Sequence, residues 1–170
     1  MLVILAVVLA SKGMPGGWTL SNWMPAGAAV SHSAAGEIVG VASVVDGDTI
    51  EIHGRRIRFD GIDAPESSQL CIRSGAKERC GRAAAFYLSD MIGSSTVRCE
   101  THDVDRYGRD IATCWLDERN LNEAMVAAGQ AVAYRQYSRT YVGAEDEARA
   151  AGVGVWAGEF EMPWDYRRAN

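Results

Sequence analysis

The chain has 170 residues and a mass of 18.4 kDa, enough for one domain with a hydrophobic core and too little for two full-sized domains. With 48% apolar and 23% charged residues, its composition is globular and excludes a disordered, collagenous or multi-span membrane protein. The net charge of −5 and the pI of about 5.2 do not predict a diffuse polyanion-binding surface. Of the 17 bases only Lys12 and Lys77 are Lys, which leaves 15 Arg. Arg suits bidentate phosphate contacts, although genome composition is the simpler explanation of the bias.

The first 35 residues differ from the rest of the chain. Residues 2–10 form an unbroken apolar run, shorter than the roughly 20 residues of a membrane-spanning helix but of the length found in secretory signals. Small residues at 33–35 and 26–28 offer two cleavage sites, although no basic residue precedes the run. We therefore expect residues 1–35 to be a signal peptide or a hydrophobic N-terminal segment plus linker. A misassigned start, a disordered extension and an uncleaved, membrane-attached segment are the alternatives.

Four cysteines lie in the body of the chain: Cys71, Cys80, Cys99 and Cys114. An even number in an exported chain predicts two disulfides, with three connectivities open. Pairing of nearest neighbours is favoured, because a turn at residues 105–109 would place Cys99 and Cys114 on facing strands. The alternative is four buried thiols in a cytosolic protein. No Cys-x-x-Cys or Cys/His ligand spacing occurs, so we do not expect a zinc site.

The first half of the body predicts three strands and a long loop. β-branched residues dominate the first strand, and apolar and polar residues alternate in the next two. Asp46-Gly47 between them is a tight-turn signal. The loop has no periodicity, and a Cys71–Cys80 bridge would clamp it. The expected strands cover residues 38–45, 49–53 and 56–59, and the loop covers residues 61–81.

The second half predicts helices and further strands. Apolar residues recur at helical spacing in three segments, and Gly129 and Gly152 follow two of them as stop signals. Trp156 is expected to cap the core. The expected elements are helices at 82–92, 121–128 and 141–151, strands at 96–100, 111–116 and 131–134, and a tail at 158–170. Five main strands with helices after the third and fifth indicate an α+β fold, which a Greek-key barrel of the OB type fits.

Two acidic segments carry candidate chemistry. In Asp46-Gly47-Asp48-Thr49, a hairpin turn is followed by a second acid, Asp48, at the start of a strand, where Asp is disfavoured. In residues 58–66, a strand runs into three acids within seven residues. Asp63 and Glu66 repel each other unless a cation lies between them, and carboxylate and carbonyl oxygens suit Ca²⁺. The alternative is a solvated acidic loop in which Asp63 caps the turn.

Two further segments display arginine and tyrosine. Residues 105–109 form a turn with two Arg, for which the alternative is a surface turn with Arg109 paired to Asp105 or Asp110. Tyr134-Arg135-Gln136-Tyr137 follows a short strand, and its tyrosines could stack on bases or sugars. Tyrosines that pack half-buried are the alternative there.

Together these segments resemble one family. The order Asp-Gly-Asp-Thr, Arg-x₄-Asp-x-Pro-Glu and Arg-Tyr-Gly-Arg is similar to that of the staphylococcal nuclease (thermonuclease-like) domain over residues 37–157, in its exported bacterial type. The resemblance implies a five-stranded OB-type β-barrel with about three packed helices. It places the nuclease domain at residues 36–158 and a C-terminal tail at 159–170.

The resemblance also implies a role for individual residues. Ala64 stands where the type member has Thr, so a carbonyl ligand survives but a hydroxyl contact is lost. Asp46 precedes a metal ligand and would support it. The implied roles are Ca²⁺ ligation by Asp48, Asp63 and the Ala64 carbonyl, phosphate binding by Arg58 and Arg109, activation of water by Glu66, and nucleotide contacts by Tyr107, Tyr134 and Tyr137.

The function implied by the resemblance is a Ca²⁺-dependent phosphodiesterase. It would cleave DNA and RNA with little sequence specificity at the 5′-O–P bond and leave 3′-phosphates. We expect an exported monomer, periplasmic or secreted, without a stable protein partner; membrane anchoring by the N-terminal segment is the alternative. The acidic pI implies weak, salt-sensitive substrate binding. A non-catalytic OB-fold nucleic-acid-binding module and a structural or protein-interaction domain are the alternative functions.

Overall fold

The computed structural model describes residues 36–170. The predicted signal peptide or hydrophobic segment, residues 1–35, lies outside the described residues. Among residues 36–170, none of the helices has the length and hydropathy needed to cross a membrane.

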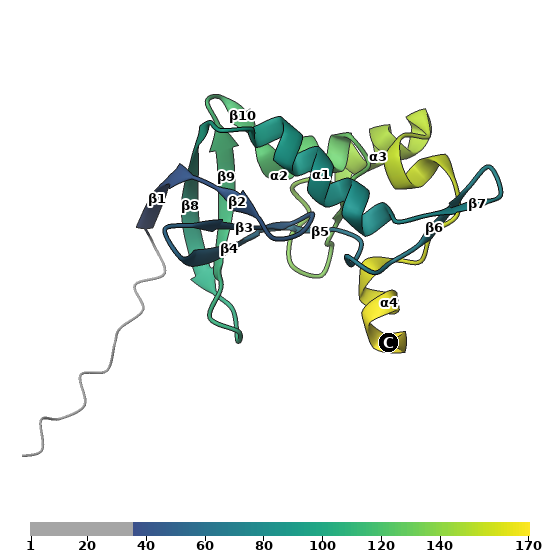
Figure 1. Ribbon diagram of the computed structural model, residues 1–170, viewed down its shortest axis with the longest axis horizontal. Helices are drawn as coiled ribbons and strands as arrows, with labels where there is room; N and C mark the ends of the chain where they lie inside the picture. Colours follow the sequence, from purple (N-terminus) through teal and green to yellow (C-terminus); the bar gives the residue numbers. More distant parts are fainter. Residues whose placement is uncertain (1–35) are drawn as a thin grey trace, which may run out of the picture. The chain divides into compact units, whose positions relative to one another are not determined.

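A curled sheet forms the centre of the domain (Figure 1). Its strands are β1 (Gly36–Val41), β2 (Ser43–Val44), β3 (Thr49–Ile52), β4 (Arg55–Phe59), β8 (Thr96–Val104), β9 (Asp110–Leu116) and β10 (Arg119–Asn120). The order is β1-β8-β9-β4-β3-β2, with β10 paired to β9, and only β4 and β9 run parallel. The two edges, β1 and β2, are consecutive parts of one bent strand interrupted at Ala42, so the sheet curls back on itself.

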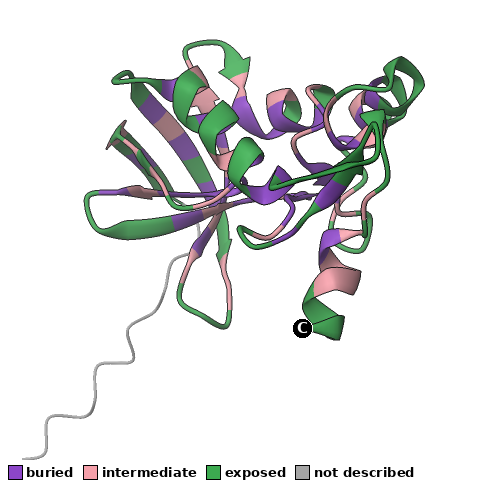
Figure 2. Cartoon of the chain, turned by 45° about the vertical axis from the view of Figure 1, so that its right-hand side comes forward, coloured by how far each residue is buried: buried purple, intermediate pink, exposed green. Residues whose placement is uncertain are grey.

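Alternation in β3 and β4 fills the interior of the sheet. Ile50 and Ile57 are register partners and both are fully buried. Ile52 and Phe59, each two residues further along its strand, are buried beside them. The core therefore lies directly under the strands that lead to the predicted acidic segments (Figure 2).

Helices α1 (Cys80–Ile92), α2 (Leu121–Ala127) and α3 (Val142–Ala151) lie together on one side of the domain, whereas α4 (Pro163–Ala169) lies apart from them at the C-terminus (Figure 1). A 3₁₀ turn occurs at Gly154–Ala157. In α1 the buried residues Ala84, Leu88 and Ile92 recur every four residues, which is the spacing of one helix face. The side chain of Asn120 caps α2 by accepting the N–H of Glu123.

The predicted α+β class and OB-type barrel are confirmed, with β1 and β2 counted as one strand. There are four α-helices among residues 36–170, against about three expected. The additional helix, α4, lies in residues 159–170, which we expected to be a tail. Trp156 packs with Cys71, Cys80 and Val155 in a small apolar cluster separate from the main core.

The long loop expected at residues 61–81 is partly strand. It contains β5 (Ile62–Asp63), which pairs with β11 (Val132–Ala133), and the hairpin of β6 (Cys71–Arg73) and β7 (Ala76–Glu78). Strands of two or three residues show no periodicity, and β5 finds its partner some 70 positions away in the sequence, so no local pattern reveals it. The β5–β11 pairing brings the acidic segment beside the tyrosine segment.

Two disulfides close the fold in the pairing that the sequence favoured. Cys71–Cys80 ties hairpin β6–β7 to the start of α1, and Cys99–Cys114 joins directly opposed residues of β8 and β9. The second bridge lies fully buried in the main core.

The Cys99–Cys114 bridge should contribute strongly to stability. The double substitution Cys99→Ala and Cys114→Ala should lower the free energy of unfolding by about 3 kcal/mol or more, because it releases a 15-residue loop closure and removes buried sulfur. Urea unfolding of the oxidised proteins measures the difference. A loss below about 1 kcal/mol would contradict the structural role given to this bridge.

Candidate active site

Three charged side chains meet where β3, β4 and β5 lie together. Asp48 immediately precedes β3, Arg58 lies in β4 and Asp63 lies in β5. The Arg58 guanidinium donates to Asp48 Oδ1 and, at 2.8 Å, to Asp63 Oδ1. Both carboxylates are buried, so each depends on this guanidinium for charge compensation.

The Asp-Gly-Asp-Thr turn fixes the carboxylate of Asp48. Asp48 Oδ2 accepts the Ala64 N–H at 2.8 Å, and Oδ1 accepts the Thr49 hydroxyl at 3.1 Å. The Asp46 carboxylate accepts the Asp48 N–H at 3.0 Å, which holds the turn itself. A Cβ at Gly47 would lie 2.7 Å from the Cβ of Ala64, so the second turn residue must be glycine for the segments to approach.

Glu66 lies at the mouth of this cluster, after β5. Its backbone N–H donates to Gln69 Oε1 at 3.1 Å, and its carbonyl accepts the Gln69 N–H at 2.7 Å. A Cβ at Gly81 would come within 1.8 Å of the Glu66 carbonyl oxygen, so the start of α1 approaches this loop only because residue 81 is glycine. The Glu66 side chain is 38% exposed, which leaves its carboxylate open to solvent.

A second arginine binds Asp63 and Glu66. Arg167, in α4, donates to both oxygens of Asp63, at 3.0 and 2.7 Å, and to Glu66 Oε1 at 2.7 Å. Sequence reasoning missed Arg167, because the contact spans about 100 residues and no local pattern marks it. The three aromatic residues Phe160, Trp164 and Tyr166 are the one signal that this segment packs against the domain.

An open cleft of about 1520 Å³ lies beside the cluster. The turn between β8 and β9 supplies one wall, where Asp105 accepts the Arg109 Nε–H at 2.8 Å and its backbone N–H at 3.0 Å. Arg109 is thus paired with Asp105, as the surface-turn alternative expected, and it still lines the cleft; Asp110 pairs with Arg55 instead. Tyr107 at the tip is 69% exposed.

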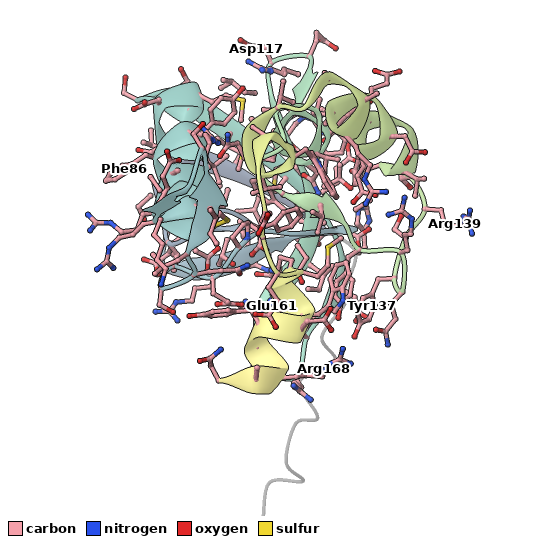
Figure 3. The ribbon with its side chains drawn as sticks, turned by 90° about the vertical axis from the view of Figure 1, so that its right-hand side faces the viewer. Phe86, Asp117, Tyr137, Arg139, Glu161 and Arg168 are labelled. Atoms are coloured by element: carbon pink, nitrogen blue, oxygen red, sulfur yellow. A yellow bond between two sulfur atoms is a disulfide. The ribbon has the colours of Figure 1, made fainter. Side chains whose placement is uncertain are left out.

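The tyrosine segment supplies another wall. Tyr134 and Tyr137 meet edge to face, with ring centroids 4.8 Å apart, and Tyr134 lies parallel to Trp164 of α4 at 5.3 Å. The buried carboxylate of Glu145 in α3 anchors the segment by accepting the Ala133 N–H at 3.0 Å and by pairing with Arg135. Tyr137 is 72% exposed and lies toward the same end of the molecule as Arg168, with Asp117 at the opposite end (Figure 3).

The structure brings nearly all predicted site residues to one cleft. Asp63 is the exception, since its side chain is fully buried beneath Arg58 and Arg167. The predicted residues that line the cleft are Asp48, Arg58, Ala64, Glu66, Tyr107, Arg109, Tyr134 and Tyr137.

Burial and neighbouring charges shift the pKa values of the acids in the cluster in different directions. Burial raises the pKa of Asp46 to about 6, and the neighbouring charge of Asp48 adds to the effect. Burial also raises the pKa of Asp48, but Arg58 and the Ala64 N–H outweigh it and hold this carboxyl below its usual pKa. For Asp63, burial and the neighbouring charge of Asp48 together raise the pKa more than Arg167 and Arg58 lower it.

The carboxylate oxygens of Asp48 and Asp63 are of the type that binds a hard cation. Two carboxylates converge on one guanidinium, and oxygen ligands of this type match Ca²⁺. Within the described part of the chain, no three His, Cys, Asp or Glu side chains are grouped to hold a metal. A cation here would therefore need backbone carbonyl, water or substrate oxygens to complete its ligands, which describes an open site rather than a structural one.

Residues 56–158 match the family model described as Staphylococcal nuclease homologue. The chain belongs to this family. It is 39% identical over 132 residues to the succinoglycan biosynthesis protein ExoI of Rhizobium meliloti (strain 1021), covering 75% of this chain and 69% of that protein. It is 34% identical over 160 residues to protein ParB of Escherichia coli, covering 83% of this chain and 85% of that protein. It is 33% identical over 148 residues to micrococcal nuclease of Shigella flexneri, covering 76% of this chain and 80% of that protein.

The raised pKa of Asp46 predicts that the free energy of unfolding falls as the pH rises. Its protonated form is favoured in the folded state, so the stability linked to it is complete below about pH 4 and lost as the pH rises through about 6. Asp46→Asn keeps the acceptor for the Asp48 N–H but cannot ionise. Between pH 4 and 7, without added divalent cation, the wild type should lose unfolding free energy relative to this variant. A difference between the two proteins that does not change with pH would contradict the assignment.

Proposed function

We propose that the protein is an exported Ca²⁺-dependent nuclease that hydrolyses DNA and RNA with little sequence preference. The observation that carries the proposal is one cleft lined by Asp48, two arginines, an open glutamate and three tyrosines, with the buried carboxylate of Asp63 joined to Asp48 through Arg58. Family membership and the relative named micrococcal nuclease support it. From the resemblance, cleavage is at the 5′-O–P bond and leaves 3′-phosphates.

Asp48, Asp63 and the Ala64 carbonyl are the residues that would hold the cation. Bound Ca²⁺ would supply a positive charge beside the phosphodiester. This assignment gives the burial of the carboxylate pair a function, because burial strengthens charge interactions between these carboxylates and the cation.

Arg58 and Arg109 would bind the phosphate oxygens on which negative charge develops during hydrolysis. Each guanidinium has five N–H donors, and neither uses all of them on its carboxylate partners in the structure. Asp105 fixes the direction of Arg109 through backbone and side-chain contacts. The two arginines therefore line the cleft with donors that remain available to phosphate.

Glu66 would accept the proton of the attacking water. Its carboxylate is solvent-accessible, and Arg167 donates hydrogen bonds both to it and to Asp63. Tyr107, Tyr134 and Tyr137 would bind the sugar and base next to the scissile phosphate. Stacking on tyrosine needs an unpaired base, so single strands and frayed ends would be preferred.

Export to the periplasm or the medium is part of the proposal. Two disulfides close the described domain, and such bridges persist in oxidising compartments.

Cleavage should require both Ca²⁺ and Glu66. The oxidised protein should cut single-stranded DNA and RNA with Ca²⁺ and not with EDTA, and its products should become extendable at the 3′ end only after phosphatase treatment. Glu66→Gln should lower kcat by about 10²–10⁴, as expected for loss of a general base. Glu118→Gln, an exposed substitution beside Asp117 at the far end of the molecule, should leave kcat unchanged (Figure 3).

Two results would redirect the proposal. Full activity of a folded Glu66→Gln variant would contradict the role of Glu66. Binding of DNA that is indifferent to EDTA, with no cleavage, would instead establish the non-catalytic binding module.

A further inference from the structure

Residues 159–170 form a segment that we call the C-terminal arm. The match to the family model ends at residue 158, so the arm lies beyond it. Its first residue, Glu159, exchanges two backbone hydrogen bonds with Ile72, at 2.8 and 2.9 Å, and the Glu161 carbonyl accepts the Gln69 side chain at 2.6 Å. Helix α4 then runs from Pro163 along the cleft, from near the labelled Glu161 to near Arg168 (Figure 3).

The arm contacts residues to which we assign function. Arg167 binds Asp63 and Glu66 through three hydrogen bonds of 2.7–3.0 Å. Trp164, one turn earlier, lies parallel to the ring of Tyr134. One short helix thus covers both a predicted metal ligand and a predicted nucleotide-binding tyrosine.

The position of Arg167 decides what can reach Asp63. The Asp63 side chain is fully buried, whereas the Arg167 side chain above it is 37% exposed. Arg167 and Arg58 together place three hydrogen bonds on the two oxygens of Asp63. A carboxylate offers about four lone-pair sites, so these contacts leave one free and keep it among positive charges.

A divalent cation needs the same oxygens that Arg167 occupies. Its ligands must point lone pairs at the metal, and a second positive charge on the same carboxylate opposes binding. Arg167 and the cation are therefore competitors for Asp63, and also for Glu66 wherever Glu66 faces the metal.

We propose that Arg167 is a built-in counter-cation of the carboxylate cluster, which a divalent cation displaces together with the end of the C-terminal arm. The proposal rests on the proposed function, because it takes Asp63 as a metal ligand. It adds a regulatory element that the family resemblance does not contain: the arm sets the affinity of the site for its metal.

The end of the C-terminal arm can detach from the domain. Seven residues are too few for a helix that is stable by itself, so α4 depends on its contacts with the domain. Pro163 is the one buried residue of α4, and residues 167–170 are exposed (Figure 2). Release of Arg167 would break its ion pairs without disturbing the anchor at Glu159.

Displacement would also couple cation and nucleotide binding. If Trp164 moves with Arg167, the covered face of Tyr134 becomes available to a base. Two ligands that both favour the displaced arm strengthen each other's binding. The alternative role for Arg167 is a third phosphate contact, in which case the arm would stay in place when the metal binds.

Ca²⁺ titration by calorimetry on the full oxidised chain tests the proposal. Arg167→Gln should bind Ca²⁺ about tenfold more tightly than the wild type, within the usual range of coupling between sites. Arg168→Gln is the matched control, since it removes an equal charge from the next residue of the helix, whose partner in the described structure is Asp165. It should change the affinity by less than about twofold. Equal or weaker binding by Arg167→Gln overturns the proposal.

Hydrogen exchange of the wild-type protein gives a second reading that needs no variant to fold. Amides of residues 164–170 should exchange faster when Ca²⁺ is added. Unchanged or slower exchange there overturns displacement and supports the phosphate-contact alternative.

The results separate this proposal from the proposed function. Tighter Ca²⁺ binding by Arg167→Gln without nucleic-acid cleavage by the wild type would support the arm and contradict the nuclease. Absence of Ca²⁺ binding by both proteins would contradict both proposals.

Discussion

Two buried carboxylates, those of Asp48 and Asp63, share the guanidinium of Arg58, and the surrounding structure holds these three charged groups together. Breaking a buried ion pair from one side costs about 3–5 kcal/mol, so none of the three residues is replaceable alone without loss. The acids can come this close only because β3, β4 and β5 hold them with backbone hydrogen bonds and turn glycines. The strands of the barrel therefore hold the side chains of Asp48, Arg58 and Asp63 in position.

Secondary contacts extend that support to the cleft. The β5–β11 pairing places the tyrosine segment beside Asp63, and the buried carboxylate of Glu145 holds the segment from behind. On the other wall, Asp105 orients Arg109. Arg167 completes the compensation of the acids from a different part of the chain. Arg58 thus pairs with Asp48 and Asp63, and Arg167 pairs with Asp63 and Glu66, so that each of the three acids has an arginine partner.

The features of the fold and the cleft that depend on local sequence were predictable. Alternation in β3 and β4, the Asp-Gly turn and the helical spacing of α1 each follow from residues close in the chain. The acids and arginines of the cleft were identified because turns and strand ends display them at fixed spacing. By contrast, Arg167, Glu145, Gly81 and the β5–β11 pairing act through contacts distant in sequence. Periodicity cannot reveal a two-residue strand or an arginine whose partner lies about 100 residues away.

We propose that Asp48 and Asp63 form a cation site around which the cleft is organised. A crystal structure of the protein grown with Ca²⁺ would show whether they do. We expect density for one cation bound by both carboxylates and by the Ala64 carbonyl, at the 2.3–2.6 Å typical of Ca²⁺–oxygen contacts. A cation bound elsewhere, with Asp48 and Asp63 still paired only to arginine at saturating Ca²⁺, would contradict the account.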